Sequence, residues 1–297
     1  MMPGSPLLRA CCALLIASAL AGCGLDEEGM ILVLDRSYAP ELLLTEKDGI
    51  TSPDGLLWED GHLVIADEGG SALRLWTPGR PVATLASREQ GLRSPEDVVR
   101  GADGSLYWTD DDTGGLWRLG ANGGISQPLK AADGLPSTEG LAASPSGAIL
   151  VGDGEKSRVV RLDPDGKATP LPLAIDKPES MALDDAGNLY IADNRAGTLY
   201  MIGRDGRLYR PIAHHEGFSP ESIRWANGAL FITDSDDGKL FRYTPAGGLE
   251  ALAVFGGDYA EVQGVTTDPQ GNIYLSFQTD LKGGRGMILR LRRTGPQ

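Results

Sequence analysis

Residues 178–193 read Pro-Glu-Ser-Met-Ala-Leu-Asp-Asp-Ala-Gly-Asn-Leu-Tyr-Ile-Ala-Asp, and variants of this stretch recur along the whole chain. The stretch contains a Pro-Glu-Ser triplet with an apolar run, a turn that ends in Gly187, and a second apolar run that ends in Asp193. Six copies are present, with their middle triplet residues 40 to 43 positions apart. These middle residues are Asp54, Glu96, Glu139, Glu179, Glu221 and Gln263.

Each copy continues with a third strand-like run and a tight turn, such as Asp-Pro-Asp-Gly at residues 163–166. A looser fourth run follows, in which proline occurs, as it does on edge strands. Four short strands in a period of about 42 residues are typical of one β-propeller blade. The sequence therefore predicts an all-β, six-bladed propeller with four-stranded antiparallel blades.

The two ends of the chain predict how the ring closes. The sixth copy has only three strands and ends at residues 291–293. The apolar stretch at residues 41–45 precedes the first copy, so we expect it to supply the missing strand. Another apolar stretch, residues 31–34, is not needed by six complete blades and could extend the closing blade.

The first 22 residues have the pattern of a secretory signal. Arg9 precedes an apolar run of about a dozen residues, which is too short for a stable membrane-spanning helix. The run ends in Leu-Ala-Gly-Cys at residues 20–23, which resembles the bacterial lipobox. The prediction is a lipoprotein signal peptide over 1–22, a lipidated Cys23 with a tether over 23–29, and a propeller over 30–297. An ordinary signal peptide with an incidental cysteine is the alternative.

The lipobox resemblance implies a location and an anchor. It places the protein in a bacterial cell envelope, held to the membrane by acyl chains on Cys23. Gly24 follows Cys23, where an Asp would resemble an inner-membrane retention signal, so the outer membrane is expected. The other two cysteines leave with the signal, so the mature chain would have no internal disulfide.

The amino-acid composition limits the classes of molecule that the protein is expected to bind. The 297 residues include 27 basic and 41 acidic side chains, a net charge of −14. Phosphate backbones need a basic surface, so nucleic acid is excluded as the main partner. With 41% hydrophobic residues, the chain can bury a core. An unknown small molecule or an envelope protein is the expected partner.

Two stretches carry a family resemblance. Residues 107–110 read Tyr-Trp-Thr-Asp, and residues 178–193 resemble an NHL repeat. The chain from about residue 40 to 293 is similar to six-bladed propellers of the YWTD, NHL and gluconolactonase–regucalcin groups. This resemblance implies the propeller fold but does not select a function, because the architecture carries many.

Strand direction in a propeller places all six triplets at one mouth of the channel, together with loop acids such as Glu68. Five acids that converge on one axis repel one another unless water, protons or a cation separate them. Carboxylate oxygens favour calcium or magnesium, and calcium suits an irregular cage. We expect a divalent cation, most simply calcium, held by Glu96, Glu139, Glu179 and Glu221. The alternative is that each acid caps the inner strand of its own blade.

The gluconolactonase resemblance implies a hydrolytic alternative. In that chemistry a metal polarises a lactone carbonyl while a carboxylate activates water. The resemblance places Asp54 at a matching catalytic position and the four glutamates as ligands. The triplets differ from the family pattern, because none contains Asn and the Glu-Gly-Pro opening is absent. His215, in the loop before blade five, is a candidate acid or base. The alternative for His214 and His215 is a solvated loop pair.

Other residues complete the predicted channel. Gln263, Arg100 and Arg224 are expected at the mouth, with the two arginines paired to acids. Trp58 and Trp225 are expected to pack between blades. The aspartates that end the second strands are expected to bind backbone amides of the next loop; they are Asp67, Asp110, Asp153, Asp193 and Asp234. Two functions stay open: a lipid-anchored propeller that binds a partner or ligand, and a metal-dependent lactonase or esterase.

Overall fold

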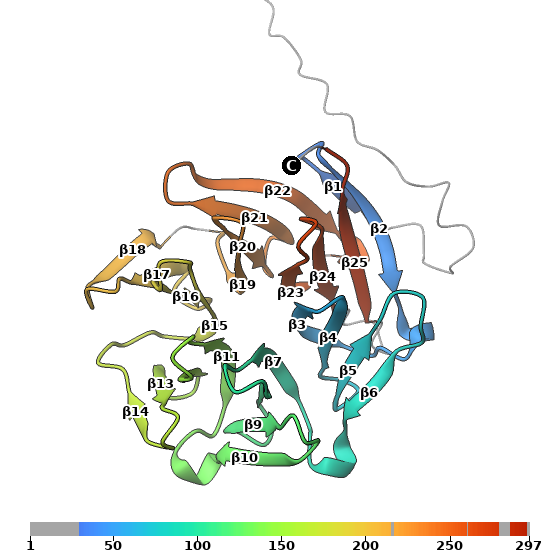
Figure 1. The fold of residues 1–297 in the computed structure, drawn as a ribbon. Helices are drawn as coiled ribbons and strands as arrows, with labels where there is room; N and C mark the ends of the chain where they lie inside the picture. The colour runs from blue at the N-terminus through green and yellow to red at the C-terminus, as the bar shows by residue number, and fades with distance from the viewer. Residues whose placement is uncertain (1–29, 215–216, 260, 279–285, 296–297) are drawn as a thin grey trace, which may run out of the picture.

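Six antiparallel sheets are arranged in a ring, with the first strand of each repeat nearest the centre (Figure 1). The computed structural model describes residues 30–214, 217–259, 261–278 and 286–295. Every sheet has an inner strand that begins at a triplet, and the predicted all-β, six-bladed propeller is confirmed. Within the described ranges, no helix is long and apolar enough to cross a membrane.

The first three blades follow one another in the chain. Blade one consists of β3 (Pro53–Glu59), β4 (His62–Asp67), β5 (Ala72–Trp76) and β6 (Ala83–Ala86). Blade two consists of β7 (Pro95–Arg100), β8 (Leu106–Asp110), β9 (Leu116–Leu119) and β10 (Ile125–Leu129). Blade three consists of β11 (Thr138–Ala143), β12 (Ile149–Asp153), β13 (Arg158–Leu162) and β14 (Ala168–Pro170).

The last three blades complete the ring. Blade four consists of β15 (Pro178–Leu183), β16 (Leu189–Asp193), β17 (Thr198–Ile202) and β18 (Leu208–Ile212). Blade five contains β19 (Pro220–Ala226), β20 (Ala229–Asp234), β21 (Lys239–Thr244) and β22 (Gly248–Gly256). Blade six contains β23 (Val262–Thr267), β24 (Ile273–Phe277) and β25 (Met287–Arg293). Short 3-10 turns lie at Glu46–Asp48, Arg88–Gln90, Ala131–Asp133 and Gly257–Tyr259.

The N-terminal strand β2 (Tyr38–Leu44) supplies the fourth strand of blade six, as predicted (Figure 1). It begins three residues before the predicted stretch 41–45 and ends at Leu44, because Thr45 caps the following 3-10 turn. It pairs antiparallel with β25, from Tyr38 opposite Arg293 to Leu44 opposite Ile288. Leu44 and Tyr38 are buried. The first and last segments of the chain therefore share one sheet, and neither closes the ring alone.

The expectation that residues 31–34 extend the closing blade is wrong. β1 (Met30–Val33) pairs with β22, so blade five becomes a five-stranded sheet. The physical reason is that blade five has a free outer edge, whereas blade six does not. β2 already occupies the outer edge of blade six, whereas the nine-residue β22 offers a long unpaired edge. The turn between β1 and β2 is held by Asp35, whose carboxylate accepts hydrogen bonds from the Ser37 amide and hydroxyl.

The aspartates that end the second strands are structural, and their role is larger than predicted. Asp193 accepts hydrogen bonds from the amides of Asp176, Lys177 and Ala196, at 2.8 to 3.1 Å. It therefore fixes the following loop and also the loop that enters the inner strand. The four others are also fully buried. Asp110 and Asp234 accept amides from both loops, whereas Asp67 accepts them from the entering loop and Asp153 from the following loop.

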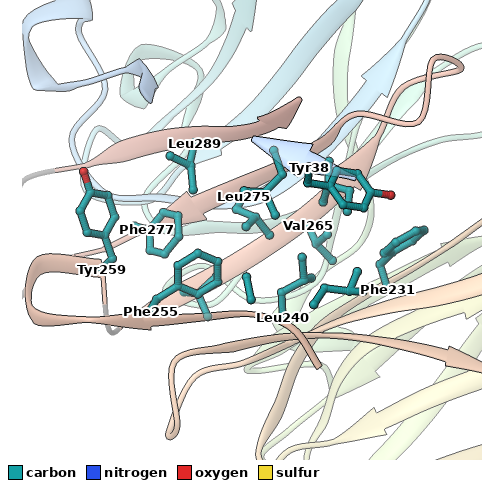
Figure 2. Close-up of a cluster of buried hydrophobic side chains, with 14 of the residues drawn as sticks. Tyr38, Phe231, Leu240, Phe255, Tyr259, Val265, Leu275, Phe277 and Leu289 are labelled. Carbon is teal, nitrogen blue, oxygen red and sulfur yellow. The ribbon is translucent and has the colours of Figure 1, made fainter. Parts of the chain in front are cut away.

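Apolar side chains fill the space between blades. Figure 2 shows the largest cluster, between blades five and six, in which Phe277 contacts Phe255 and Tyr259 edge-to-face. Trp58 of blade one stacks on Tyr274 of blade six at 4.7 Å between ring centroids. Trp225 stacks in the same way on Tyr190 of blade four. The predicted interblade role of both tryptophans is confirmed.

Candidate metal and ligand site at the channel mouth

The triplets meet in space, as the strand direction predicted. The inner strands begin at the triplets, and five middle residues line one cavity at this end of the channel. The cavity has a volume of about 20 Å³, which is room for about one water molecule or one ion. The five are Asp54, Glu96, Glu139, Glu179 and Glu221.

Contacts between neighbouring inner strands keep these acids at fixed spacing. The third residue of each triplet is either Gly or a residue whose side chain accepts a hydrogen bond from a backbone amide of the next blade. A Cβ on Gly55 would lie 2.4 Å from the carbonyl oxygen of Glu96, so only glycine fits there. The accepting side chains are Asp97 for the amide of Leu141, Ser180 for Ile223, and Ser222 for Val265.

Three carboxylates cluster on one side of the mouth. Oxygen atoms of Asp54, Glu68 and Glu96 all lie within 4.8 Å of one another. Glu68 accepts hydrogen bonds from the Ser94 hydroxyl and from the Gln278 amide, both at 3.0 Å. Glu68 follows the structural Asp67 in the chain, and it is therefore aimed at the mouth by the same buried turn. Carboxylates at this spacing form a group that can hold a metal ion.

The group is electrostatically strained. Burial raises the pKa of Asp54 well above its ordinary value, and the nearby Glu221 and Glu68 raise it further. Burial likewise raises the pKa of Glu96, and Asp54 adds to the rise. Two buried carboxyl groups this close repel each other when both are ionised, and a proton held by one of them relieves that repulsion. A bound cation would replace that proton and favour the ionised forms.

The opposite side of the mouth already contains a cation that the sequence did not reveal. The Lys177 ammonium lies 2.8 Å from Glu179 and 4.0 Å from Glu139. Burial lowers the pKa of Lys177, but these two carboxylates outweigh burial and the net pKa is raised. Lys177 stands directly before the triplet Pro178-Glu179-Ser180, and this adjacency was the available sequence signal.

Glu221 is held by neutral donors. Its carboxylate accepts hydrogen bonds from the Asn194 amide at 2.9 Å and the Ser235 hydroxyl at 2.8 Å. Burial raises the pKa of Glu221. Burial and the neighbouring Glu221 and Glu139 together raise the pKa of Glu179 well above its ordinary value. The four predicted ligands thus divide into Glu96, which joins Asp54 and Glu68, and three glutamates around Lys177, Asn194 and Ser235.

One predicted arginine reaches the channel and the other does not. Arg224 lies 2.5 Å from the Asp97 carboxylate and donates to the Leu56 carbonyl, so its predicted pairing with a channel acid is present. Arg100 is instead paired with Glu59, because it ends β7 whereas the triplet begins that strand. The predicted position of Arg100 at the mouth is wrong.

The remaining candidates lie apart from the cavity or outside the described residues. Gln263 begins blade six near the mouth and accepts a hydrogen bond from Thr233 through its backbone carbonyl, but its side chain is not among those that line the cavity. His215 and Cys23 lie outside the described residues. His214 is exposed, and its Nδ1 donates to the carbonyl of Ala196.

Comparison with known proteins supports the fold alone. No family model matches the sequence, and no curated protein matches it. Solved structures do match. The chain is similar to a virginiamycin B lyase from Staphylococcus aureus, with 15% identity and a TM-score of 0.64 over 86% of this chain and all of the other.

Two further structures fit the resemblance to the gluconolactonase–regucalcin group. A candidate gluconolactonase is 16% identical, with a TM-score of 0.66 over 89% of this chain and 96% of the other. A calcium-binding regucalcin from Agrobacterium tumefaciens is 16% identical, with a TM-score of 0.68 over 86% of this chain and 93% of the other. At this identity the likeness establishes a shared six-bladed propeller fold.

Proposed function

We propose that the protein is a lipid-anchored propeller of the cell envelope that binds a divalent cation, preferentially calcium, in its channel mouth. The observation that carries the proposal is the group of three carboxylates, from Asp54, Glu68 and Glu96, within 4.8 Å of one another. The occupied mouth then presents a cation to a small ligand or an envelope protein that docks on this face. The calcium-binding description of one structural neighbour supports the choice of ion.

The chemistry of the group favours calcium over softer metals. All three residues offer carboxylate oxygens, which are hard ligands suited to calcium or magnesium. They come from blades one and two with irregular spacing, and calcium accepts irregular coordination more readily than magnesium. Ser94 and Gln278 orient Glu68 by hydrogen bonds, as residues behind a metal ligand commonly do.

Calorimetric titration with calcium tests the cation site. We expect one saturable site in the native protein. The double variant Asp54→Asn, Glu96→Gln should bind about a hundredfold more weakly or not at all, because two charged ligands are removed. Asp165→Asn removes an exposed acid in the turn between β13 and β14, away from the mouth, and serves as the matched control. No heat of binding in the native protein, or equal affinities in all three proteins, would refute the cation site.

A metal-dependent lactone or ester hydrolase is the second candidate, favoured by the likeness to a candidate gluconolactonase. In this case the ion would polarise a carbonyl group above the cavity, because the cavity itself has no room for a lactone. Hydrolysis of a lactone and ester panel with calcium, suppressed by a chelator and by Asp54→Asn, would select the enzyme over the binding module.

The lipid anchor predicts a second, independent result. In cells fed radioactive palmitate, the native protein should carry label and sediment with the outer membrane. Cys23→Ser should abolish both, since Cys23 is the one cysteine that follows the proposed signal peptide. Cys12→Ser, inside the removed signal, is the matched control and should change neither. Label that persists in Cys23→Ser would contradict the anchor.

A further inference from the structure

The acids at the channel mouth divide into two groups. Asp54, Glu68 and Glu96 come from blades one and two and form the candidate cation site. The second group comes from the inner strands of blades three, four and five; it consists of Glu139, Glu179 and Glu221. Between described residues, the ion pairs of these six acids all belong to the second group, and both are made by Lys177. The two groups therefore differ in whether the protein supplies its own cation.

The backbone of Lys177 is held in place just before β15. Its amide donates to the Asp193 carboxylate at 3.0 Å, and its carbonyl accepts hydrogen bonds from the amides of Glu179 at 2.9 Å and Asn194 at 3.2 Å. The side chain extends from this fixed point to the mouth, where the ammonium nitrogen lies 2.8 Å from Glu179 and 4.0 Å from Glu139. The position of the ammonium group therefore rests on the same buried turn that orders the blade.

The neighbouring loop of blade three leaves space for this ion pair. Gly154 follows the structural Asp153 in that loop. A Cβ on Gly154 would lie 3.0 Å from Oε1 of Glu139 and 3.4 Å from Cγ of Lys177, so any side chain there would crowd both. The packing on this side of the mouth is therefore shaped around the lysine and its glutamate.

The Glu179 carboxylate needs a cation beside it. Its side chain is 8% exposed, and its Oε2 atom is buried and makes no hydrogen bond. A buried ionised oxygen without a hydrogen bond is stable only beside an opposite charge, and here that charge is the Lys177 ammonium group, 2.8 Å away. Without the ammonium group, the same oxygen would be available to a metal ion.

We propose that Lys177 occupies the second group of acids as a permanent cation and thereby limits the channel mouth to one divalent ion. A lysine ammonium group is a compact point charge, and a second cation among the same carboxylates would be repelled by it. The three glutamates therefore form a latent calcium site that the native protein keeps closed.

A ligand that docks on this face meets one ion, beside blades one and two. The inference rests on the proposed function for this first ion only, because Lys177 occupies the second group whether or not calcium binds the first.

Equilibrium dialysis with radioactive calcium at pH 8 counts the ions bound per chain of the purified mature protein. We expect one ion in the native protein and two in Lys177→Ala, which removes the ammonium group and leaves space for the ion. Lys177→Gln should also bind two, and its amide still donates to the glutamates, which favours folding if the alanine variant does not fold. Lys177→Arg keeps the positive charge, so it is the matched control and should bind one. Far-ultraviolet circular dichroism in calcium checks that each variant is folded.

Further substitutions locate each ion. Adding Glu179→Gln to Lys177→Ala should remove the second ion, whereas adding Glu96→Gln should remove the first, so that each double variant binds one. A count of one in Lys177→Ala and Lys177→Gln, even with a higher affinity, overturns the proposal, and so does a second ion in Lys177→Arg.

The same counts separate this inference from the proposed function. No ion in the native protein but one in Lys177→Ala, lost again on adding Glu179→Gln, would refute the proposed site at Asp54, Glu68 and Glu96 and support the role of Lys177. One ion in the native protein and one in both neutral variants would support the proposed site and refute the role of Lys177. No ion in any of these proteins would refute both.

Discussion

A chain that begins at Thr45 is expected not to fold. It lacks β2, whose seven residues form the outer strand of blade six and pair with β25. Leu44 and Tyr38 are buried against blades one and five, and Leu42 is packed in the same core as Tyr38. Losing this burial and the strand pairing removes roughly 5–10 kcal/mol, about the whole free energy of unfolding of a typical domain. Far-ultraviolet circular dichroism and urea unfolding would measure the loss.

A chain that begins at Arg36 is the matched control. It loses β1 but keeps β2, so the ring still closes and only the extra edge strand of blade five is missing. We expect cooperative unfolding, with a free energy lower by about 1–3 kcal/mol. If the two truncated chains unfold at the same urea concentration, ring closure by β2 is not what stabilises the propeller.

Replacing Lys177 by Met is expected to destabilise the protein at alkaline pH but much less at acidic pH. The ammonium stabilises the ionised forms of Glu179 and Glu139, both nearly buried. Without it, burial and mutual repulsion raise the pKa values of these glutamates further in the folded state. At pH 8 we expect a loss of about 2–3 kcal/mol, somewhat below that for breaking a fully buried pair because Lys177 is partly exposed.

The sign of the pH dependence follows from linkage. A carboxyl group whose pKa is higher in the folded than in the unfolded state binds its proton more tightly when folded. Its contribution to stability is therefore complete below the unfolded pKa and is lost as the pH rises through the folded pKa. The difference between native and Lys177→Met should grow from about pH 4 to pH 8 in urea unfolding. Lys167→Met, in an exposed turn, is the control.

An equal loss at both ends of this pH range would assign Lys177 a packing role. In the presence of a chelator, the free energy of unfolding of the native protein should also decrease as the pH rises, because folding raises the pKa values of Asp54 and Glu96 as well.

The repeat in the sequence was sufficient for the fold and for the location of the acids. Six copies at nearly constant spacing require six equivalent units, and chain direction within one unit places every triplet at the same channel mouth. The aspartates that end the second strands were also assigned correctly, because a residue repeated in five blades serves the blade itself. The closing role of residues 41–45 followed from the missing strand of the sixth copy.

The grouping of the acids could not be read from the repeat. Equivalent positions look alike in sequence, but each side chain also meets a neighbour that differs from blade to blade. Glu139 and Glu179 meet Lys177, Glu221 meets Asn194, and Glu96 meets Asp54. Arg100 was misplaced because its distance along β7 from the triplet decides which end of the channel it reaches.

The sequence by itself determined the six-bladed ring, its closure by an N-terminal strand that contains residues 41–44, and the ring of acids at one mouth, because these follow from periodicity and strand direction. Only the tertiary structure decided that Asp54, Glu68 and Glu96 form one group, that Lys177 neutralises the other side, and that β1 joins blade five. These features depend on contacts between blades. Such contacts depend on how side chains pack at about 4.0 to 4.5 Å between heavy atoms, which the spacing of residues along the chain does not specify.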